Sequence, residues 1–344
     1  MSKPRKRVTI RDVAKIAGVS PATVSLVLGG DPRVNEKTRK HVLDTVERLQ
    51  YTPNEIGRIM RSQRIGAIAF IIPNTSSHVF SHPYFSQLLE GMTEVMNRYN
   101  YNLLISTTPN EKDEAVAYDK ILRNRRADGI ILSSASIHDD NLLRAADSGY
   151  PVVYLGKWFH PDVLTVERDD FGGAYQATEH LIKLGRRRIV HVSGPLDHQE
   201  SLDRLEGYKQ ALADHKILFE NEWLMEKDFS RESGYRAGME LVDAGIAFDA
   251  VFAGNDLMAI GLLKAFKERG IAVPRDVSLV GFDDIEMASV VSPQLTTVRQ
   301  PMKLIGALAA EKLMNVLHGE PPGERRTKVT TELIIRESCG SGAN

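Results

Sequence analysis

The spacing of apolar residues over positions 9–30 predicts two short helices joined by a tight turn. Their buried faces would be formed by Val13, Ala14 and Ala17 in the first helix and by Val24, Val27 and Leu28 in the second. Thr9 with Asp12 fits a capping box, and Ser20 fits the next N-cap. Gly18 suits the left-handed end of the first helix, and Pro21 suits the start of the second. This pattern is typical of a helix-turn-helix, although an ordinary αα-hairpin would also produce it.

A third amphipathic helix is predicted to complete this small domain. Asn35 fits its N-cap, and its apolar face would consist of Val42, Leu43, Val46 and Leu49. Residues 1–63 contain 13 Lys and Arg against 6 Asp and Glu, a formal charge of +7. The whole chain carries −1, so the other 281 residues carry −8. A basic head on an acidic body suits contact with nucleic-acid phosphates by the head alone, which favours the helix-turn-helix.

From Gly66 onward, short apolar runs alternate with longer helical stretches. The predicted strands are 67–72, 102–107, 129–132, 152–155, 188–192, 250–253 and 278–282, with a further one near 223–225. Helices such as 85–99, 172–184, 256–269 and 302–317 accompany them. This alternation predicts parallel sheets covered by helices on both faces. A TIM barrel would give the same rhythm, so periodicity alone leaves it open.

Polar and aromatic side chains follow several of these strands, where open α/β sheets bind their ligands. They are His78, His82, Tyr84, Phe85, Asp197, His198, Arg204, Lys227, Asp228, Phe229, Asn255, Asp256, Asp283 and Asp284. Such a mixture suits a small polyhydroxylated molecule. Asn255 and Asp256 could instead cap a helix, Asp284 could face water, and Phe229 or Tyr84 could belong to the core. A structural role is harder to find for Arg204 and Asp283, because a charge in a cleft needs a partner.

Several motifs resemble, in the right order, the LacI/GalR family of bacterial transcriptional regulators. They are DVAKIAGVS, TVSLVL and LQYTPN in the head, and GPL, ESGYRAG, NDLMAIG, VPRDVSLVGFDD and LTTVRQP in the body. The resemblance implies an all-α helix-turn-helix head over 1–53, a hinge helix over 54–65 and an α/β body over 66–344. The body would consist of two doubly wound parallel-sheet lobes like those of periplasmic sugar-binding proteins. The first lobe would comprise about 66–164 and 297–326, and the second about 165–296 and 327–341.

The resemblance also places DNA contacts in the head and the hinge. They fall on Thr9, Ser20, Pro21, Ala22, Thr23, Ser25, Leu26 and Asn35, and on Arg58, Met60 and Arg61. The second helix of the motif would lie in the major groove of double-stranded DNA. Many family members carry Arg where Leu26 stands, so we expect only an apolar contact there. Met60 matches the family's apolar minor-groove wedge, which is usually Leu, although the same segment could be a plain charged linker.

Effector contacts are implied in the same way. The resemblance assigns them to Tyr84, Phe85, Arg204, Phe229, Asn255 and Asp283, and the position after a strand adds His198. His198 and Glu200 stand where purine-binding members have Arg and Thr, and Gly156 stands where many members have Asp. A purine is therefore disfavoured. We expect a sugar or sugar derivative as the effector.

These features together predict a ligand-responsive, sequence-specific transcriptional regulator, a repressor, that binds a near-palindromic operator as a homodimer. The terminal segment CGSGAN lacks the heptad extension that tetramerises the lac repressor. One alternative is a regulator of the same kind controlled by a protein partner. Another is a solute-binding receptor, against which the basic head and the absence of an apolar leader argue.

The sequence gives no indication of catalysis. It contains no GxGxxG after a strand, and no GxxxxGK, HExxH or GxSxG motif. The lone Cys339 can form no internal disulfide and has no partner for a metal site, so neither a metal nor a cofactor is expected. No apolar run approaches the roughly 20 residues that span a bilayer. We therefore expect a cytoplasmic protein that is not an enzyme.

Overall fold

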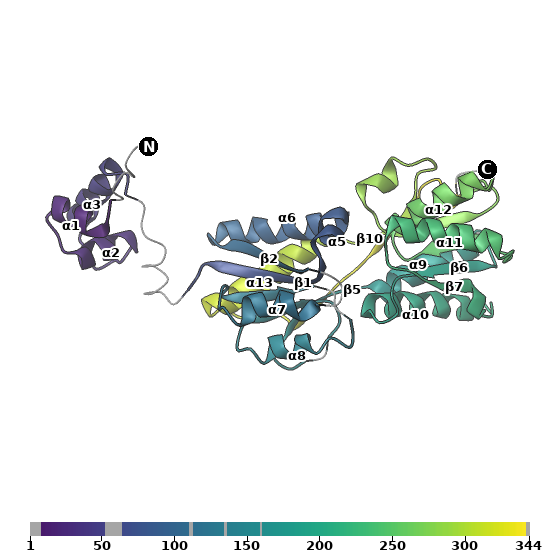
Figure 1. Cartoon of the computed structure of the whole chain (residues 1–344), viewed down its shortest axis with the longest axis horizontal. Coiled ribbons are helices and arrows are strands. Elements are labelled where there is room, and N and C mark those ends of the chain that lie inside the picture. The colour runs from purple at the N-terminus through teal and green to yellow at the C-terminus, as the bar shows by residue number, and fades with distance from the viewer. Residues whose placement is uncertain (1–7, 52–63, 110–112, 134–135, 159, 342–344) are drawn as a thin grey trace. The chain divides into compact units, whose positions relative to one another are not determined.

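The computed structural model describes residues 8–51, 64–109, 113–133, 136–158 and 160–341. The chain forms two compact units, Met1–Ile65 and Gly66–Asn344, which we call the head and the body. Figure 1 shows that the described part of the head is helical and that the body contains two groups of strands with covering helices. The proposed hinge helix at 54–65, with Arg58, Met60 and Arg61, lies almost entirely outside the described residues.

The head consists of helices α1 (Ile10–Ala17), α2 (Pro21–Leu28) and α3 (Glu36–Arg48). The predicted caps are confirmed: Thr9 and Asp12 form a capping box, and Gly18 ends α1 with a φ of 65°. Side-chain oxygens of Ser20 and Asn35 accept hydrogen bonds from the backbone N–H groups of the third residue of α2 and of α3. The buried core contains Val13, Ala14, Ala17, Val24, Val27, Val42 and Tyr51.

One core prediction in the head is wrong. Leu43, expected to face inward, is 44% exposed. Its neighbour Val42 is fully buried instead, and Tyr51 fills the space beyond the end of α3. The apolar face of this helix is therefore narrower than the sequence pattern indicated, because three short helices enclose only a small core.

The body contains two six-stranded sheets. The first has the order β11-β5-β4-β3-β1-β2 and the second β12-β10-β9-β8-β6-β7. The strands of the first sheet are β1 (Ala67–Thr75), β2 (Asn102–Thr108), β3 (Gly129–Leu132), β4 (Val152–Leu155), β5 (Leu164–Arg168) and β11 (Arg326–Val329). Those of the second are β6 (Ile189–Ser193), β7 (Leu224–Glu226), β8 (Ala250–Ala253), β9 (Ser278–Asp283), β10 (Thr296–Arg299) and β12 (Glu332–Ile334). Two separate open sheets exclude a single closed barrel.

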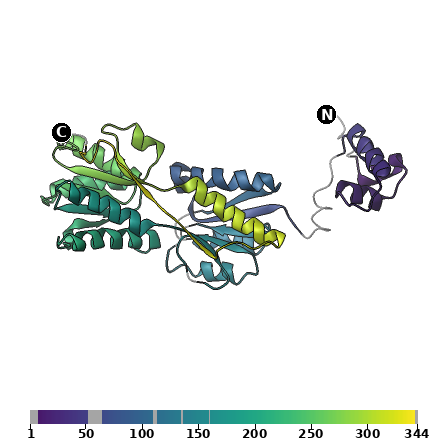
Figure 2. The ribbon, with the colours of Figure 1, turned by 180° about the vertical axis from the view of Figure 1, so that it is seen from behind.

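Helices cover both faces of each sheet, and each sheet with its helices forms one lobe. The first lobe contains α5 (Ser76–Ser81), α6 (Pro83–Arg98), α7 (Glu114–Leu122), α8 (Asn141–Ala146) and α13 (Met302–His318). The second contains α9 (Asp170–Lys183), α10 (Gln199–Asp214), α11 (Arg231–Asp243) and α12 (Asp256–Glu268), with 3-10 turns at Asn221–Trp223 and Glu286–Ser289. Figure 2, from behind, shows α13 lying on the first lobe although it is late in the sequence.

The strand pairing corrects the expected lobe boundaries. Strand β5 pairs with β4 in the first sheet, β10 pairs with β9 in the second, and β11 returns to pair with β5. The chain thus changes lobe after residues 168, 299 and 329, whereas the sequence placed these changes after 164, 296 and 326. The short strands β5 and β11 were not predicted, because charged residues interrupt their apolar pattern.

Two glycines allow α6 and α13 to pack closely. A Cβ atom at Gly91 would lie 1.9 Å from the carbonyl oxygen of Lys303, and one at Gly306 would lie 2.2 Å from that of Leu88. These neighbours are backbone atoms, which cannot move without separating the two helices. Close packing places α13 against the core of the first lobe.

We expect Gly91→Ala to destabilise the body by about 1–3 kcal/mol, because the added methyl group must push the helices apart. Asn97→Ala, on the exposed side of the same helix, should leave stability unchanged or slightly higher, since Ala favours helices. Urea unfolding followed by circular dichroism would measure both variants. Equal stability of the two would show that α6 and α13 can separate without cost.

Candidate ligand-binding and nucleic-acid-binding sites

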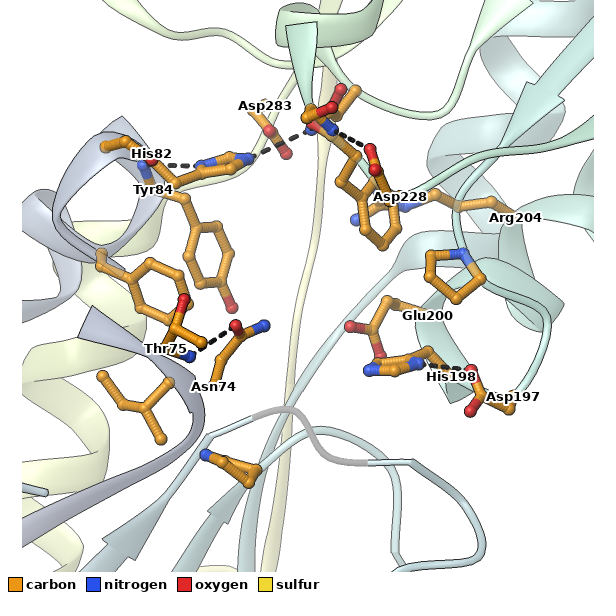
Figure 3. A pocket seen from close by; sticks show the side chains of 18 of the residues that line it. Asn74, Thr75, His82, Tyr84, Asp197, His198, Glu200, Arg204, Asp228 and Asp283 are labelled. Carbon is orange, nitrogen blue, oxygen red and sulfur yellow. Dashed lines mark hydrogen bonds and ion pairs between the residues drawn. The ribbon is translucent and has the colours of Figure 1, made fainter. Parts of the chain in front are cut away.

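A cavity of about 650 Å³ lies at the carboxyl ends of the strands, with walls from both lobes. Its residues from the first lobe end β1, begin α6 and α7, and end β5. Those from the second lobe follow β6 and β7, begin α10 and α12, and end β9. All seven predicted effector residues line it: Tyr84, Phe85, His198, Arg204, Phe229, Asn255 and Asp283. Figure 3 shows several of these side chains facing one another across the open space.

Three other strand-end residues nominated by the sequence, Lys227, Asp256 and Asp284, do not line the cavity. Asp256 is completely buried, and its carboxylate accepts hydrogen bonds from Thr297 Oγ1 (2.5 Å) and the Ile285 N–H (2.9 Å). Burial raises the pKa of Asp256 well above its usual range. Asp284 forms ion pairs with Arg299 and Arg336 and does not face water. Both residues hold the segments around β9 in place. The side chain of His78 lies outside the described residues.

The deepest polar feature of the cavity wall is an ion network centred on Asp170. Arg204 donates to Asp170 Oδ1 through Nε at 2.9 Å, and its Nη2 lies 2.7 Å from the same oxygen. Arg168 donates to the other oxygen through Nε at 3.2 Å. Burial would raise the pKa of Asp170, but the charges of Arg168 and Arg204 outweigh it and hold the pKa below its usual range. The carboxylate therefore stays ionised between two guanidinium groups.

Each arginine also has contacts beyond Asp170. Arg204 is only 4% exposed, donates to the Gly254 carbonyl (2.6 Å) and lies over the Phe282 ring, 3.9 Å from its centroid. Arg168 contacts Glu200 (3.8 Å) and donates to the hydroxyl of Tyr84 in the first lobe. Sequence reasoning missed Arg168 and Asp170. The run Arg168-Asp169-Asp170 after an apolar stretch would have suggested them, had β5 been recognised.

Asp283 occupies the end of β9 in a conformation that favours glycine. Its φ is 122°, and only 6% of the residue is exposed. Oδ1 accepts a hydrogen bond from Gln300 Nε2 at 2.6 Å. Burial raises the pKa of Asp283 to about 6, against the opposing effect of Arg204. Phe229, at φ 66°, is the second cavity residue in this region of the Ramachandran plot. Such strained positions concentrate at functional sites.

Asn255 connects the two lobes across the cavity. Its Oδ1 caps α12 by accepting from the Met258 N–H (2.8 Å), which confirms the capping role. Its Nδ2 donates to the Phe229 carbonyl (2.9 Å) and lies 3.1 Å from Nε2 of His82, the N-cap of α6 in the first lobe. A second connection joins the Ile137 N–H to the Asp197 carbonyl (2.8 Å). Capping and cavity lining are therefore compatible functions of one amide.

In the head, α2 presents an exposed face. Pro21, Ala22 and Leu26 are exposed, Thr23 and Ser25 are half-buried, and Leu26 has 39% of its surface accessible. The other predicted DNA contacts, Thr9, Ser20 and Asn35, are the N-caps of the three helices. Their side-chain oxygens are already used within the head, so DNA contact there stays a prediction.

Across the described residues, none of the helices combines the length and apolarity needed to cross a bilayer. The same part of the chain holds no group of three or more His, Cys, Asp or Glu side chains placed to bind a metal ion.

Comparison with known proteins agrees with both units. Residues 9–54 match the family model "Bacterial regulatory proteins, lacI family", and residues 178–339 match "Periplasmic binding protein-like domain". Catabolite control protein A of Priestia megaterium is 32% identical over 96% of this chain and 99% of its own length. The transcriptional regulator CelR of Thermobifida fusca is 33% identical over 97% of this chain and 99% of its own length.

Solved structures extend the similarity to the fold. A complex of the transcriptional regulator CelR with cellobiose has a TM-score of 0.74 at 32% identity, covering 96% of this chain and all of the other. The lac repressor dimer bound to operator and an anti-inducer has a TM-score of 0.84 at 26% identity, covering 97% and 99%. These relatives are transcriptional regulators and not enzymes. The helix-turn-helix head, the two-lobed body and the similarity over nearly the whole length show that the chain belongs to the lacI family of bacterial regulatory proteins.

Proposed function

We propose that this protein is a cytoplasmic repressor that binds a near-palindromic operator as a homodimer and responds to a small carbohydrate-type effector. The observation that carries the proposal is that one cavity is lined, from both lobes, by all seven residues predicted from the sequence. Its guanidinium, carboxylate and amide groups beside Tyr84, Phe85 and Phe229 suit a molecule with many hydroxyls and an apolar face. Two relatives support the choice: CelR was solved with cellobiose, and the lac repressor dimer with operator DNA.

The same arrangement supports a coupling between ligand and DNA. A ligand that contacts His82 and Tyr84 in one lobe and Asn255 and Arg204 in the other binds best at one angle between the lobes. The His82–Asn255 contact is made at the angle seen here and would change at another. Effector binding would thus alter how the two heads of a dimer reach the half-sites.

For DNA recognition, we propose that α2 enters the major groove with the exposed face at Pro21, Ala22, Thr23, Ser25 and Leu26. Thr9, Ser20 and Asn35 would place helix N-termini near phosphates, where partial positive charge favours an anion. Arg58, Met60 and Arg61 would act in the minor groove.

Leu26→Arg should create a guanine preference that the native protein lacks at one base pair of each half-site. A guanidinium can bind guanine O6 and N7 together, whereas Leu offers only an apolar contact. Selection of binding sites from random DNA would measure the preference. Ile16→Arg is the matched control, because it adds the same charge at an exposed apolar position of α1 and should leave the selected sequence unchanged. Identical sites for Leu26→Arg and the native protein would contradict the proposed reading face.

Asp283→Ala should abolish the effect of the ligand on operator binding while keeping ligand-free operator affinity. Loss of a charge-assisted hydrogen bond should weaken ligand binding about ten- to hundredfold. Operator titrations of the full-length protein with and without a panel of sugars would measure both quantities. Glu206→Ala, at an exposed position of α10 outside the cavity, should respond as the native protein does.

Two outcomes would count against this part of the proposal. A full ligand response in Asp283→Ala would place the effector elsewhere. A native protein whose operator binding no sugar changes would favour control by another kind of partner.

A further inference from the structure

Among the residues that the structure describes, more acidic than basic groups line the cavity. Five carboxylates line it, those of Glu114, Asp197, Glu200, Asp228 and Asp283. The guanidinium groups that line it are those of Arg168 and Arg204. His82 and His198 are the other ionisable bases in the lining, and His198 lies 2.8 Å from Asp197. Acidic groups therefore dominate any charge that a ligand meets.

The two arginines are already matched by anions of the protein. Asp170, which does not itself line the cavity, lies between them, and Glu200 adds a second carboxylate beside Arg168. Three nitrogens of Arg204 are used by Asp170 and the Gly254 carbonyl. An anionic ligand would have to compete with these contacts, since a buried cation that is already paired gains little from another anion.

Asp283 feels the charge of Arg204 but forms no ion pair with it among the described residues. Its Oδ1 is bound by a neutral amide, and its Oδ2 makes no hydrogen bond or ion pair with the residues that the structure describes. Only 6% of the surface of Asp283 is exposed, yet the residue lines the cavity. Oδ2 is not one of the fully buried atoms without a partner, so it is reached from the cavity, where a ligand can supply a donor. The strained backbone at Asp283 holds that oxygen in place.

The remaining acidic side chains lie nearer solvent, on both lobes. Glu114 begins α7 in the first lobe, while Asp197 and Asp228 follow β6 and β7 in the second. Burial, and then the charge of Asp139, raise the pKa of Glu114 above its usual value. Carboxylates on both sides of an opening attract cations into it and repel anions.

We propose that the effector is a polyhydroxylated molecule with a protonated amine and without phosphate or carboxylate, as in an amino sugar or amino polyol. This inference rests on the proposed function, because it concerns the same cavity. The ammonium group binds Asp283 Oδ2, and the hydroxyls bind the amide and guanidinium groups around it. Glu114, Asp197 and Asp228 favour the charge of the incoming ligand.

The test uses full-length protein and three matched sets of hexoses, with the glucose, galactose and mannose configurations. Each set contains the neutral sugar, its 2-amino derivative and its 6-phosphate, compared by calorimetry near pH 7. In any set that binds, we expect the amine to bind about tenfold more tightly than the neutral sugar, the difference between a charged and a neutral hydrogen bond. The phosphate should bind more weakly than both.

Two variants test whether the carboxylates cause the expected order of affinities, with the amine tightest and the phosphate weakest. Asp283→Asn keeps the shape of the side chain and should remove most of the preference for the amine. Glu114→Gln, nearer solvent, should reduce the preference by a smaller factor and serves as the second variant if Asp283→Asn fails to fold. Glu206→Gln makes the same change of charge at an exposed position of α10 outside the cavity and should leave the preference intact.

Tighter binding of a neutral sugar or a phosphate than of the matching amine would overturn this inference and leave the proposed carbohydrate effector standing. A preference for the amine that both cavity variants retain would also overturn it. A different outcome would contradict the proposed function itself: no member of any set would bind or change operator affinity.

Discussion

The carboxylate of Asp170 is the interaction on which the cavity depends. It is buried with two guanidinium groups, one at the end of a strand of the first sheet and one on a helix of the second lobe. With Glu200 beside Arg168, two carboxylates balance the two guanidinium groups, so removing one charge would leave another uncompensated in a low-dielectric interior. Through Arg168 the same carboxylate also fixes the position of Tyr84. The wall of the cavity therefore contains one electrostatic unit with members from both lobes.

Around this unit, some polar side chains of the cavity have all their hydrogen-bond partners within the protein, and others keep an atom free for a ligand. Arg204 stacks on Phe282 and uses most of its donors within the protein, which leaves it to shape the site more than to attract charge. Asp283 keeps one oxygen available and a pKa close to neutrality, because burial opposes its ionisation. An arginine that is already paired and a carboxylate with one available oxygen give a site that can select ligands by charge as well as by shape.

Sequence patterns predicted much of this architecture because local physics determines it. Caps at Thr9, Ser20 and Asn35 depend on neighbours three residues away, and long apolar runs such as β1 have few other conformations. The carboxyl-end rule nominated all seven expected effector residues, which line the cavity, but also Lys227, Asp256 and Asp284, which do not. Pairing between distant segments was harder to predict: β11 joins β5 across more than a hundred residues, and Arg204 reaches Asp170 from 34 residues further along the chain. Leu43 was misplaced because periodicity does not reveal how wide a buried face is.

The three lobe changes after residues 168, 299 and 329 have a consequence for synthesis of the chain on the ribosome. The first lobe begins at β1 but needs α13 for its core and β11 for the edge of its sheet. The second likewise awaits β12. Neither lobe can close before these late segments have been synthesised, so apolar surfaces made early stay exposed until then. Folding of the body is thus a late, joint event whose speed is limited by contacts between the ends of the chain.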